Sequence, residues 1–134
     1  MKTDFNKKVS RIVEKDPRYK ADAYEFVMLA LTRTQKDLSR KGHVSGQELV
    51  KGIRRFGMDQ FGPLTKTVFN SWGVEKTADF GAIVFNMIDH GLMSKNESDS
   101  TEDFNDVYDF NRDLNVFGSD FRIEKKNESK DILS

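Results

Sequence analysis

The chain has 134 residues, 37% of them hydrophobic and 33% charged, and its 22 basic side chains balance 22 acidic ones. This length is typical of one domain, which can bury enough apolar surface to fold without a metal or a disulfide. The absence of cysteine excludes disulfides, thiolate nucleophiles, iron–sulfur clusters and cysteine-based zinc sites.

The first residues lack the apolar region of a signal peptide, and no stretch approaches the roughly 18 uninterrupted apolar residues that a membrane span needs. We therefore expect a cytoplasmic protein that does not cross a membrane.

The first two helices are predicted from apolar residues at helical spacing. A helix from Thr3 or Asp4 should end at Asp16-Pro17, because proline disfavours helical geometry in the residue before it. Its apolar positions are Phe5, Val9, Ile12 and Val13. A second helix is expected over residues 20–40. Residues 24–31 are apolar over most of its circumference, which favours a central, buried position.

The third helix has the clearest start signal in the sequence. Ser45 and Glu48 form a capping box, in which the hydroxyl and the carboxylate each satisfy a free backbone N–H. Gly62-Pro63 should end the helix. Its polar face carries a basic cluster, which consists of Lys51, Arg54 and Arg55.

Two shorter helices are expected to follow. Residues 64–72 form the fourth, with Gly73 as a left-handed cap. The fifth should begin at Thr77 and close at Gly91. It is apolar nearly all round, so we expect it deep in the core.

After the fifth helix the pattern changes to one that favours strands. Residues 92–94 and 107–110 read as the two strands of a hairpin around an acidic loop, residues 95–106. The predicted fold is therefore mainly α, a compact bundle of about five helices followed by a short β-hairpin, in a winged-helix-like order. One domain should span residues 1–117, followed by a flexible polar tail at 118–134.

Charge is distributed unevenly along the chain. Residues 1–20 carry seven basic against three acidic side chains, residues 33–66 eight against three, and residues 89–114 two against eight. The chain thus combines a basic helical half with an acidic late segment.

No catalytic or metal-binding motif emerges. His43 and His90 have no second ligand at metal spacing, so structural roles are expected for both. The calcium-loop pattern that begins at Asp109 fails, because Leu114 replaces the required glycine and Asp120 the required glutamate. We predict no catalytic residue, no metal and no cofactor, although weak divalent-cation binding by the acidic hairpin loop stays open.

The basic face of the third helix is the best nucleic-acid candidate. In a winged-helix arrangement, however, the fifth helix would enter the groove, and residues 77–92 contain no Lys or Arg but do contain Asp79 and Asp89. Phosphates would repel the acidic wing as well. A winged-helix shape used for protein contacts is favoured over DNA reading.

Several short blocks have a recognisable pattern. They are Val44-Ser45-Gly46-Gln47-Glu48-Leu49, Gln60-Phe61-Gly62-Pro63, Trp72-Gly73, Asp79-Phe80-Gly81, Gly91-Leu92-Met93-Ser94-Lys95 and Tyr108-Asp109-Phe110. Over residues 5–110 the chain resembles a family of small uncharacterised bacterial proteins best known from planctomycete and verrucomicrobial lineages. The resemblance implies no reaction, cofactor or catalytic residue.

Polar residues within or beside these blocks are the preferred site candidates, since apolar residues are expected to pack in the core. With the basic face, the predicted interaction residues are Lys51, Arg54, Arg55, Gln60, Lys66, Asn86, Lys95, Glu102 and Asp103. The same criterion also selects Arg18, Gln47, Glu48 and Ser94. The sequence favours a non-enzymatic protein-interaction or regulatory domain that binds another protein or a second copy of itself. The alternative is a nucleic-acid-binding domain that uses the basic face of the third helix.

Overall fold

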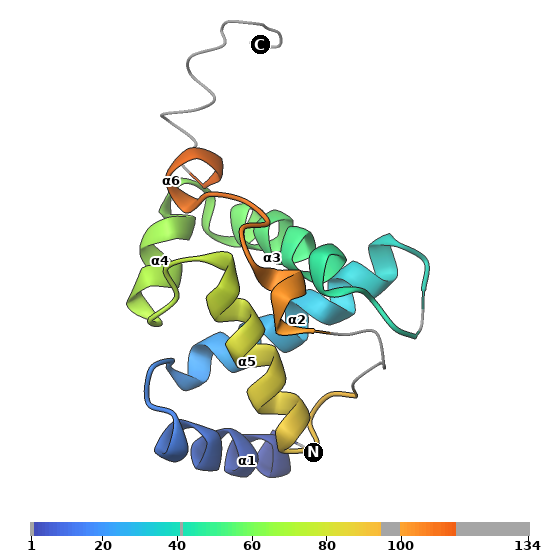
Figure 1. Ribbon diagram of the computed structural model, residues 1–134, viewed down its shortest axis with the longest axis vertical. Helices are drawn as coiled ribbons and strands as arrows, with labels where there is room; N and C mark the ends of the chain where they lie inside the picture. The colour runs from blue at the N-terminus through green and yellow to red at the C-terminus, as the bar shows by residue number, and fades with distance from the viewer. Residues whose placement is uncertain (1, 41, 95–99, 115–134) are drawn as a thin grey trace, which may run out of the picture.

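The computed structural model describes residues 2–40, 42–94 and 100–114, and these ranges are mainly helical (Figure 1). The longer elements are α1 (Lys2–Lys15), α2 (Ala21–Asp37), α3 (Gly46–Phe61), α4 (Thr65–Ser71) and α5 (Thr77–Asp89). The shorter ones are the 3-10 turns η1 (Gly62–Leu64) and η2 (Thr101–Phe104) and the single-turn helix α6 (Phe110–Asp113).

Helix α5 occupies the centre of the molecule (Figure 1) and contacts α1, α2, α3 and η2. Phe80, Ile83 and Met87 on this helix are fully buried. Surrounding a helix on several sides requires apolar residues around most of its circumference, which is the pattern that the sequence shows. The prediction of a core position for this helix is confirmed.

Helices α2 and α3 pack closely because the contact contains a glycine. A Cβ added at Gly52 would overlap the side chain of Thr34, so only glycine permits this separation of the two backbones. Thr34 is buried, and its hydroxyl has no hydrogen-bond partner among the described residues. Helix α2 buries one face only, since Leu29 on the other side is 53% exposed.

Aromatic rings fill the core between α2, α4 and α5. Phe69 lies in the middle, with its ring centroid 5.6 Å from that of Phe26, 5.8 Å from that of Trp72, 5.2 Å from that of Phe80 and 5.9 Å from that of Phe110. Tilted and edge-to-face pairs at these distances are favourable beyond the apolar area that they bury.

The predicted caps are present. Ser45 and Glu48 form the capping box at the start of α3. Gly73 and Gly91 have positive φ angles of 94° and 75°, which glycine adopts without steric strain. Helix α2 ends at Asp37 rather than at Arg40, because Ser39 takes a positive φ of 55° and turns the chain out of the helix.

The predicted β-hairpin is wrong. Residues 92–93 are bends, and the segment from Ser100 to Leu114 folds as η2, a turn, bends and α6, with no strand anywhere in the described ranges. Ser100 caps η2, accepting a hydrogen bond from the Glu102 N–H, and Asp109 caps α6. Such short polar side chains bind the nearby backbone and favour helical turns over a ladder. Without a wing, the winged-helix description fails too. Residues 95–99 of the expected loop and the tail at 118–134 lie outside the described residues.

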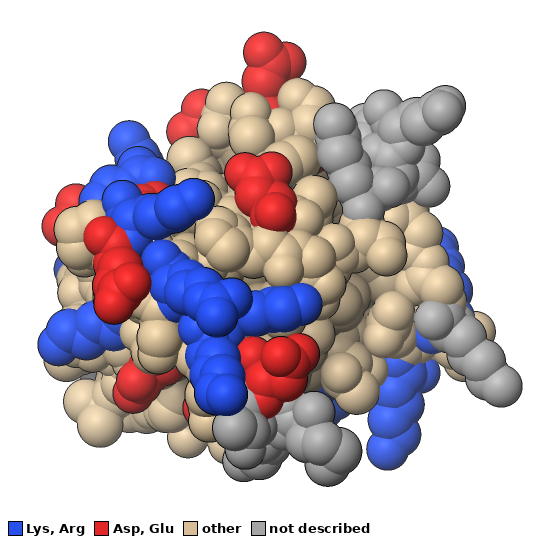
Figure 2. All heavy atoms as spheres, turned by 90° about the horizontal axis from the view of Figure 1, so that it is seen from below, with Lys and Arg blue, Asp and Glu red and all other residues tan. Residues whose placement is uncertain are grey.

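Helix α1 lies along one side of the molecule, at the bottom of Figure 1, and packs against α2 and α5. Val9 and Ile12 are the buried residues of this contact. Seen from that side, the surface has a gathering of Lys and Arg side chains with acidic ones among and around them (Figure 2).

Candidate functional site

Residues 100–114, which we call the docked segment, pack across α3 and α5. Phe104 anchors the segment and is only 3% exposed. A Cβ at Gly46 would lie 2.9 Å from the Phe104 ring, and one at Gly81 would lie 2.9 Å from the Phe104 Cβ. The Thr77 hydroxyl donates to the Phe104 carbonyl at 2.6 Å and accepts from the Val107 N–H at 3.2 Å. The acidic segment is thus held by an apolar wedge and a buried hydroxyl.

Two further hydrogen bonds attach the docked segment to α3. The Arg54 Nε donates to the Asp113 carbonyl at 2.9 Å, and the Tyr108 hydroxyl donates to the Val50 carbonyl at 3.3 Å. Burial raises the pKa of Tyr108 above its usual range, so this hydroxyl stays protonated as a donor. Arg54 therefore helps to hold the docked segment on α3.

An apolar groove of about 490 Å³ lies between α2, α5, residues 42–46 and residues 91–94. Half-buried apolar side chains form its walls, namely Met28, Leu31, Phe85, Ile88, Leu92 and Met93. Val84, Leu49 and Phe104 close the floor. Polar side chains are few in the lining: Gln35, His43 and Ser94. The volume is in the range of ligand and peptide pockets.

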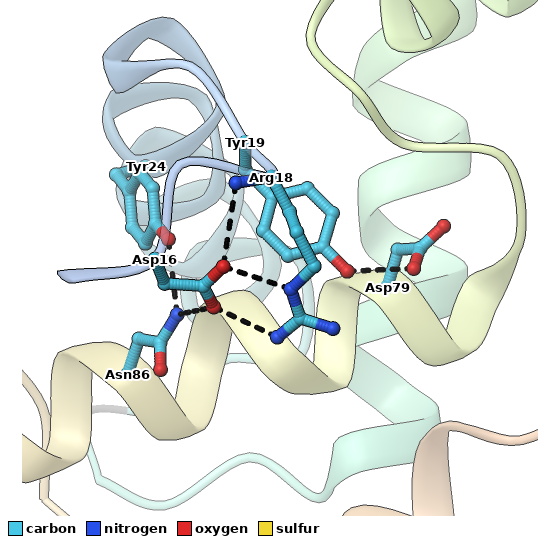
Figure 3. Close-up of polar contacts among 6 residues, drawn as sticks. All are labelled: Asp16, Arg18, Tyr19, Tyr24, Asp79 and Asn86. Carbon is cyan, nitrogen blue, oxygen red and sulfur yellow. Dashed lines mark hydrogen bonds and ion pairs between the residues drawn. The ribbon is translucent and has the colours of Figure 1, made fainter. Parts of the chain in front are cut away.

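A second feature, the Asn86 network, joins the turn between α1 and α2 to α5 (Figure 3). The Asn86 Nδ2 donates to the Asp16 Oδ2 at 3.0 Å and to the Tyr24 hydroxyl at 3.1 Å. Arg18 donates two hydrogen bonds to the same carboxylate, from its Nε to Oδ1 at 2.8 Å and from its Nη2 to Oδ2 at 2.7 Å. Asp16 thus accepts hydrogen bonds from Arg18 within the turn and from Asn86 on α5.

Beside this network, Tyr19 binds the start of α5. Its hydroxyl donates to the Asp79 Oδ1 at 2.6 Å, while the Asp79 Oδ2 accepts from the backbone N–H groups of Glu75 at 2.8 Å and Lys76 at 3.2 Å. Burial and then the Asp79 carboxylate raise the pKa of Tyr19 above its usual range. Both carboxylate oxygens of Asp79 are occupied, which is the pattern of a structural contact rather than of a general base.

Electrostatics favour the charged form of Asp16. Its hydrogen bonds from the Arg18 guanidinium hold the pKa of the carboxyl well below its usual range, and the Asn86 amide acts in the same direction against partial burial. A depressed pKa in the folded state adds stability above the unfolded pKa of about 4. That stability is lost as the pH falls through the lower, folded value.

Replacing Asp16 with Asn should therefore lower the free energy of unfolding by about 1 kcal/mol at neutral pH, because Arg18 is largely exposed and its pairing is screened by solvent. The deficit should shrink below about pH 4, because Asp16 then takes up a proton in the unfolded wild-type chain while the folded protein still keeps the carboxylate charged. Urea unfolding of both proteins at pH values from below about 4 to neutral measures this difference in the free energy of unfolding. The control is Asp37→Asn, which removes an exposed pairing with Arg33 and should have a smaller effect. A deficit that is constant with pH would contradict the linkage.

Two of the three residues of the predicted basic face make contacts within the molecule. Lys51 is exposed, but Arg54 is bound to the Asp113 carbonyl, and the Arg55 guanidinium lies 4.0 Å from the carboxylate of Asp37. The structure therefore does not leave three unengaged cations on α3.

The other predicted site residues lie on separate elements. Asn86 belongs to the network of Figure 3, and Gln60 is exposed near the end of α3. Lys66 lines a separate polar cavity of about 330 Å³. Asp103 accepts from the Ser100 N–H at 3.1 Å and so caps η2, whereas Glu102 is exposed. Lys95 lies outside the described residues.

Among the four further candidates, only Ser94 lines the groove. Arg18 holds Asp16, Glu48 caps α3 and also accepts from Arg40 Nη1 at 2.6 Å, and Gln47 is exposed.

The groove itself was missed by sequence reasoning, which assigns apolar side chains to the core. A signal was nonetheless present, because both α2 and α5 carry more apolar positions than one buried face requires. The surplus on α2 and α5, including Met28, Phe85 and Ile88, forms the walls.

Membrane-spanning helices and metal-binding clusters are two further features that a functional site could involve. No helix in the described part of the chain is long and apolar enough to span a membrane. Within the same residues, no three His, Asp or Glu side chains converge in a way that could hold a metal ion.

Comparison with known proteins finds no matching family model, no matching curated protein and no matching solved structure. The resemblance suggested by the blocks around Ser45 and Asp79 therefore stays a prediction.

Proposed function

We propose that the chain is a non-enzymatic protein-interaction domain whose groove binds the apolar face of an amphipathic helix from a protein partner. The observation that carries the proposal is the contiguous wall of half-buried apolar side chains between α2 and α5. Concave apolar surface left open by a folded domain marks an interaction site more often than a packing defect.

The composition of the groove favours a peptide over a polar metabolite. No Asp, Glu, Lys or Arg lines it among the described residues, and the Gln35 amide is already bound to the Gly42 carbonyl at 2.9 Å. Sites for small polar molecules contain several converging polar groups. Met28 and Met93 supply flexible, polarisable side chains, which suit a groove that receives apolar anchors from a helix.

The size of the groove sets the expected strength. Stable complexes bury roughly 1,200–2,000 Å² in total, whereas a groove of this volume receives only a few anchoring side chains. We therefore expect a transient contact, with a dissociation constant of about 1–100 µM.

A display library of helical peptides with apolar residues at positions i, i+3 or i+4 and i+7 supplies the probe. Binding of a selected peptide is measured by fluorescence anisotropy, and amide NMR shifts locate it. Met28→Gln should weaken binding by about tenfold or more, because an anchor loses its apolar partner. Leu29→Gln is the matched control on the same helix, since Leu29 is 53% exposed and does not line the groove.

The proposal fails if no peptide is selected, or if both substitutions weaken binding equally. Steep weakening by salt would also count against it, because apolar anchors depend little on ionic strength. Light scattering of the protein alone separates partner binding from self-association through the same groove.

Nucleic-acid binding through the basic face of α3 has less support. Arg54 donates a hydrogen bond to the docked segment, and Arg55 lies near Asp37. Of the three residues, only Lys51 is an exposed cation without such a contact among the described residues.

A further inference from the structure

Helix α1 carries a second surface, which shares no residue with the lining of the groove but adjoins it where Lys8 approaches Gly91. Three of its basic residues, Lys7, Arg11 and Lys15, recur every four positions, and Lys8 lies beside them. At about 100° per residue these four side chains fall within an arc of roughly 100°. Lys7, Arg11 and Lys15 are exposed and Lys8 is half-buried. We call this set the α1 basic face.

None of these four cations has an ion-pair partner within residues 2–40, 42–94 and 100–114. The ion pairs found among the described residues involve Arg18, Arg33, Arg40, Arg55 and Arg112, and none involves the α1 basic face. The view from this side shows basic side chains together on the surface (Figure 2). At the same rotation per residue Asp4 falls within this arc and Glu14 at its edge, so the face carries a moderate local excess of two positive charges.

The rest of α1 narrows the class of partner. Its apolar side is already packed, with Val9 and Ile12 buried, so it has no apolar face to insert into a lipid surface. The basic face contains no aromatic or aliphatic side chain and three of its four cations are lysines. Protein interfaces are depleted in lysine and enriched in aromatic residues, so the composition also disfavours a protein partner.

We infer that the α1 basic face binds the phosphate backbone of a nucleic-acid duplex, independently of its base sequence. Lysine and arginine supply this kind of contact, and a duplex presents one negative charge about every 1.7 Å along its axis. Lys7, Arg11 and Lys15 follow one another along the helix with about 6 Å of helical rise and about 40° of rotation between neighbours. Single strands are less suited, because no aromatic ring on this face offers a base a stacking surface.

Anisotropy titrations of fluorescent DNA and RNA duplexes of about 20 base pairs test this inference. We expect a dissociation constant of about 1–100 µM in low salt, typical of non-specific binding. Four phosphate contacts predict a log–log salt slope of about −3 to −4. Comparing the two duplexes shows whether the backbone conformation matters.

The decisive variants are two charge-matched double substitutions. Lys7→Glu with Arg11→Glu reverses two cations of the α1 basic face, whereas Lys36→Glu with Lys51→Glu makes the same net change on exposed residues of α2 and α3. The first should weaken duplex binding by about tenfold or more and flatten the salt slope by about 2, and the second should change both far less. Thermal unfolding followed by circular dichroism confirms that each variant is folded.

Several results would overturn the inference. Equal losses in the two double variants would show a response to net charge alone, and a slope near zero would exclude phosphate contacts. Polyglutamate or vesicles rich in phosphatidylserine serve as rival polyanions. If either binds as tightly as the duplexes and loses binding with the same α1 variant, the partner is an acidic protein or a membrane instead. Loss of peptide binding to the groove leaves this inference untouched.

Discussion

Replacing Phe104 with Ala is expected to lower the free energy of unfolding by about 3–5 kcal/mol, the range for large aromatic side chains removed from a core. The ring is almost fully buried and seated against two glycines, so little else can move in to fill the space. Because Thr77 bonds the carbonyl of the same residue, the loss should extend to the attachment of the whole docked segment.

Urea unfolding monitored by circular dichroism measures this effect, with Phe5→Ala as the matched control. Phe5 is half-buried and lies on α1, far along the chain from the docked segment, so its removal should cost less than half as much. Proteolysis should also cleave the Phe104→Ala protein faster between residues 100 and 114, since that segment opens more often. Equal losses for the two variants would mean that the segment adds little to the fold.

Replacing Gly52 with Ala should cost about 2–3 kcal/mol, even though alanine is the better helix former. The added methyl would overlap the Thr34 hydroxyl and push α2 and α3 apart along the contact that they share. Gly42→Ala is the control, because no atom lies within 4 Å of a Cβ at that position and the change should be close to neutral.

A second substitution at position 34 tests the cause. Thr34→Ala removes both the obstructing atoms and a buried hydroxyl without a hydrogen-bond partner, so adding it to Gly52→Ala should recover about 1 kcal/mol or more. The interaction energy comes from the four urea curves of the double-mutant cycle. Additive losses would show that the overlap is relieved elsewhere.

Most of the helices could be predicted from the sequence because their signals are local. Ser45 and Glu48 mark the start of α3, and the proline at position 17 together with Gly73 and Gly91 marks ends that the structure confirms. Helical spacing of apolar residues also identified the core position of α5, since burial on several sides affects the composition of one short segment. The same reasoning wrongly favoured a central position for α2, which buries one face only.

The features that the sequence did not reveal depend on distant contacts. The alternation at residues 107–110 resembles a strand, but a strand forms only with a partner, and Asp109 instead caps a helical turn. Asn86 was selected as a site candidate, yet its partner Asp16 lies 70 positions away and was assigned only to a helix end. No local pattern predicts that the chain brings the Asp113 carbonyl next to Arg54, so the sequence gives no sign of this hydrogen bond on α3.

The wedge of Phe104 between Gly46 and Gly81 also constrains how such a protein can evolve. Neither glycine can gain a side chain while the phenylalanine is present, so the residue at position 104 has to become smaller first. Phe104 also closes the floor of the groove, which means that the permissive first step deepens the groove. A lineage that crosses this barrier would therefore arrive with a repacked interior and a reshaped groove, although no residue on the rim had changed.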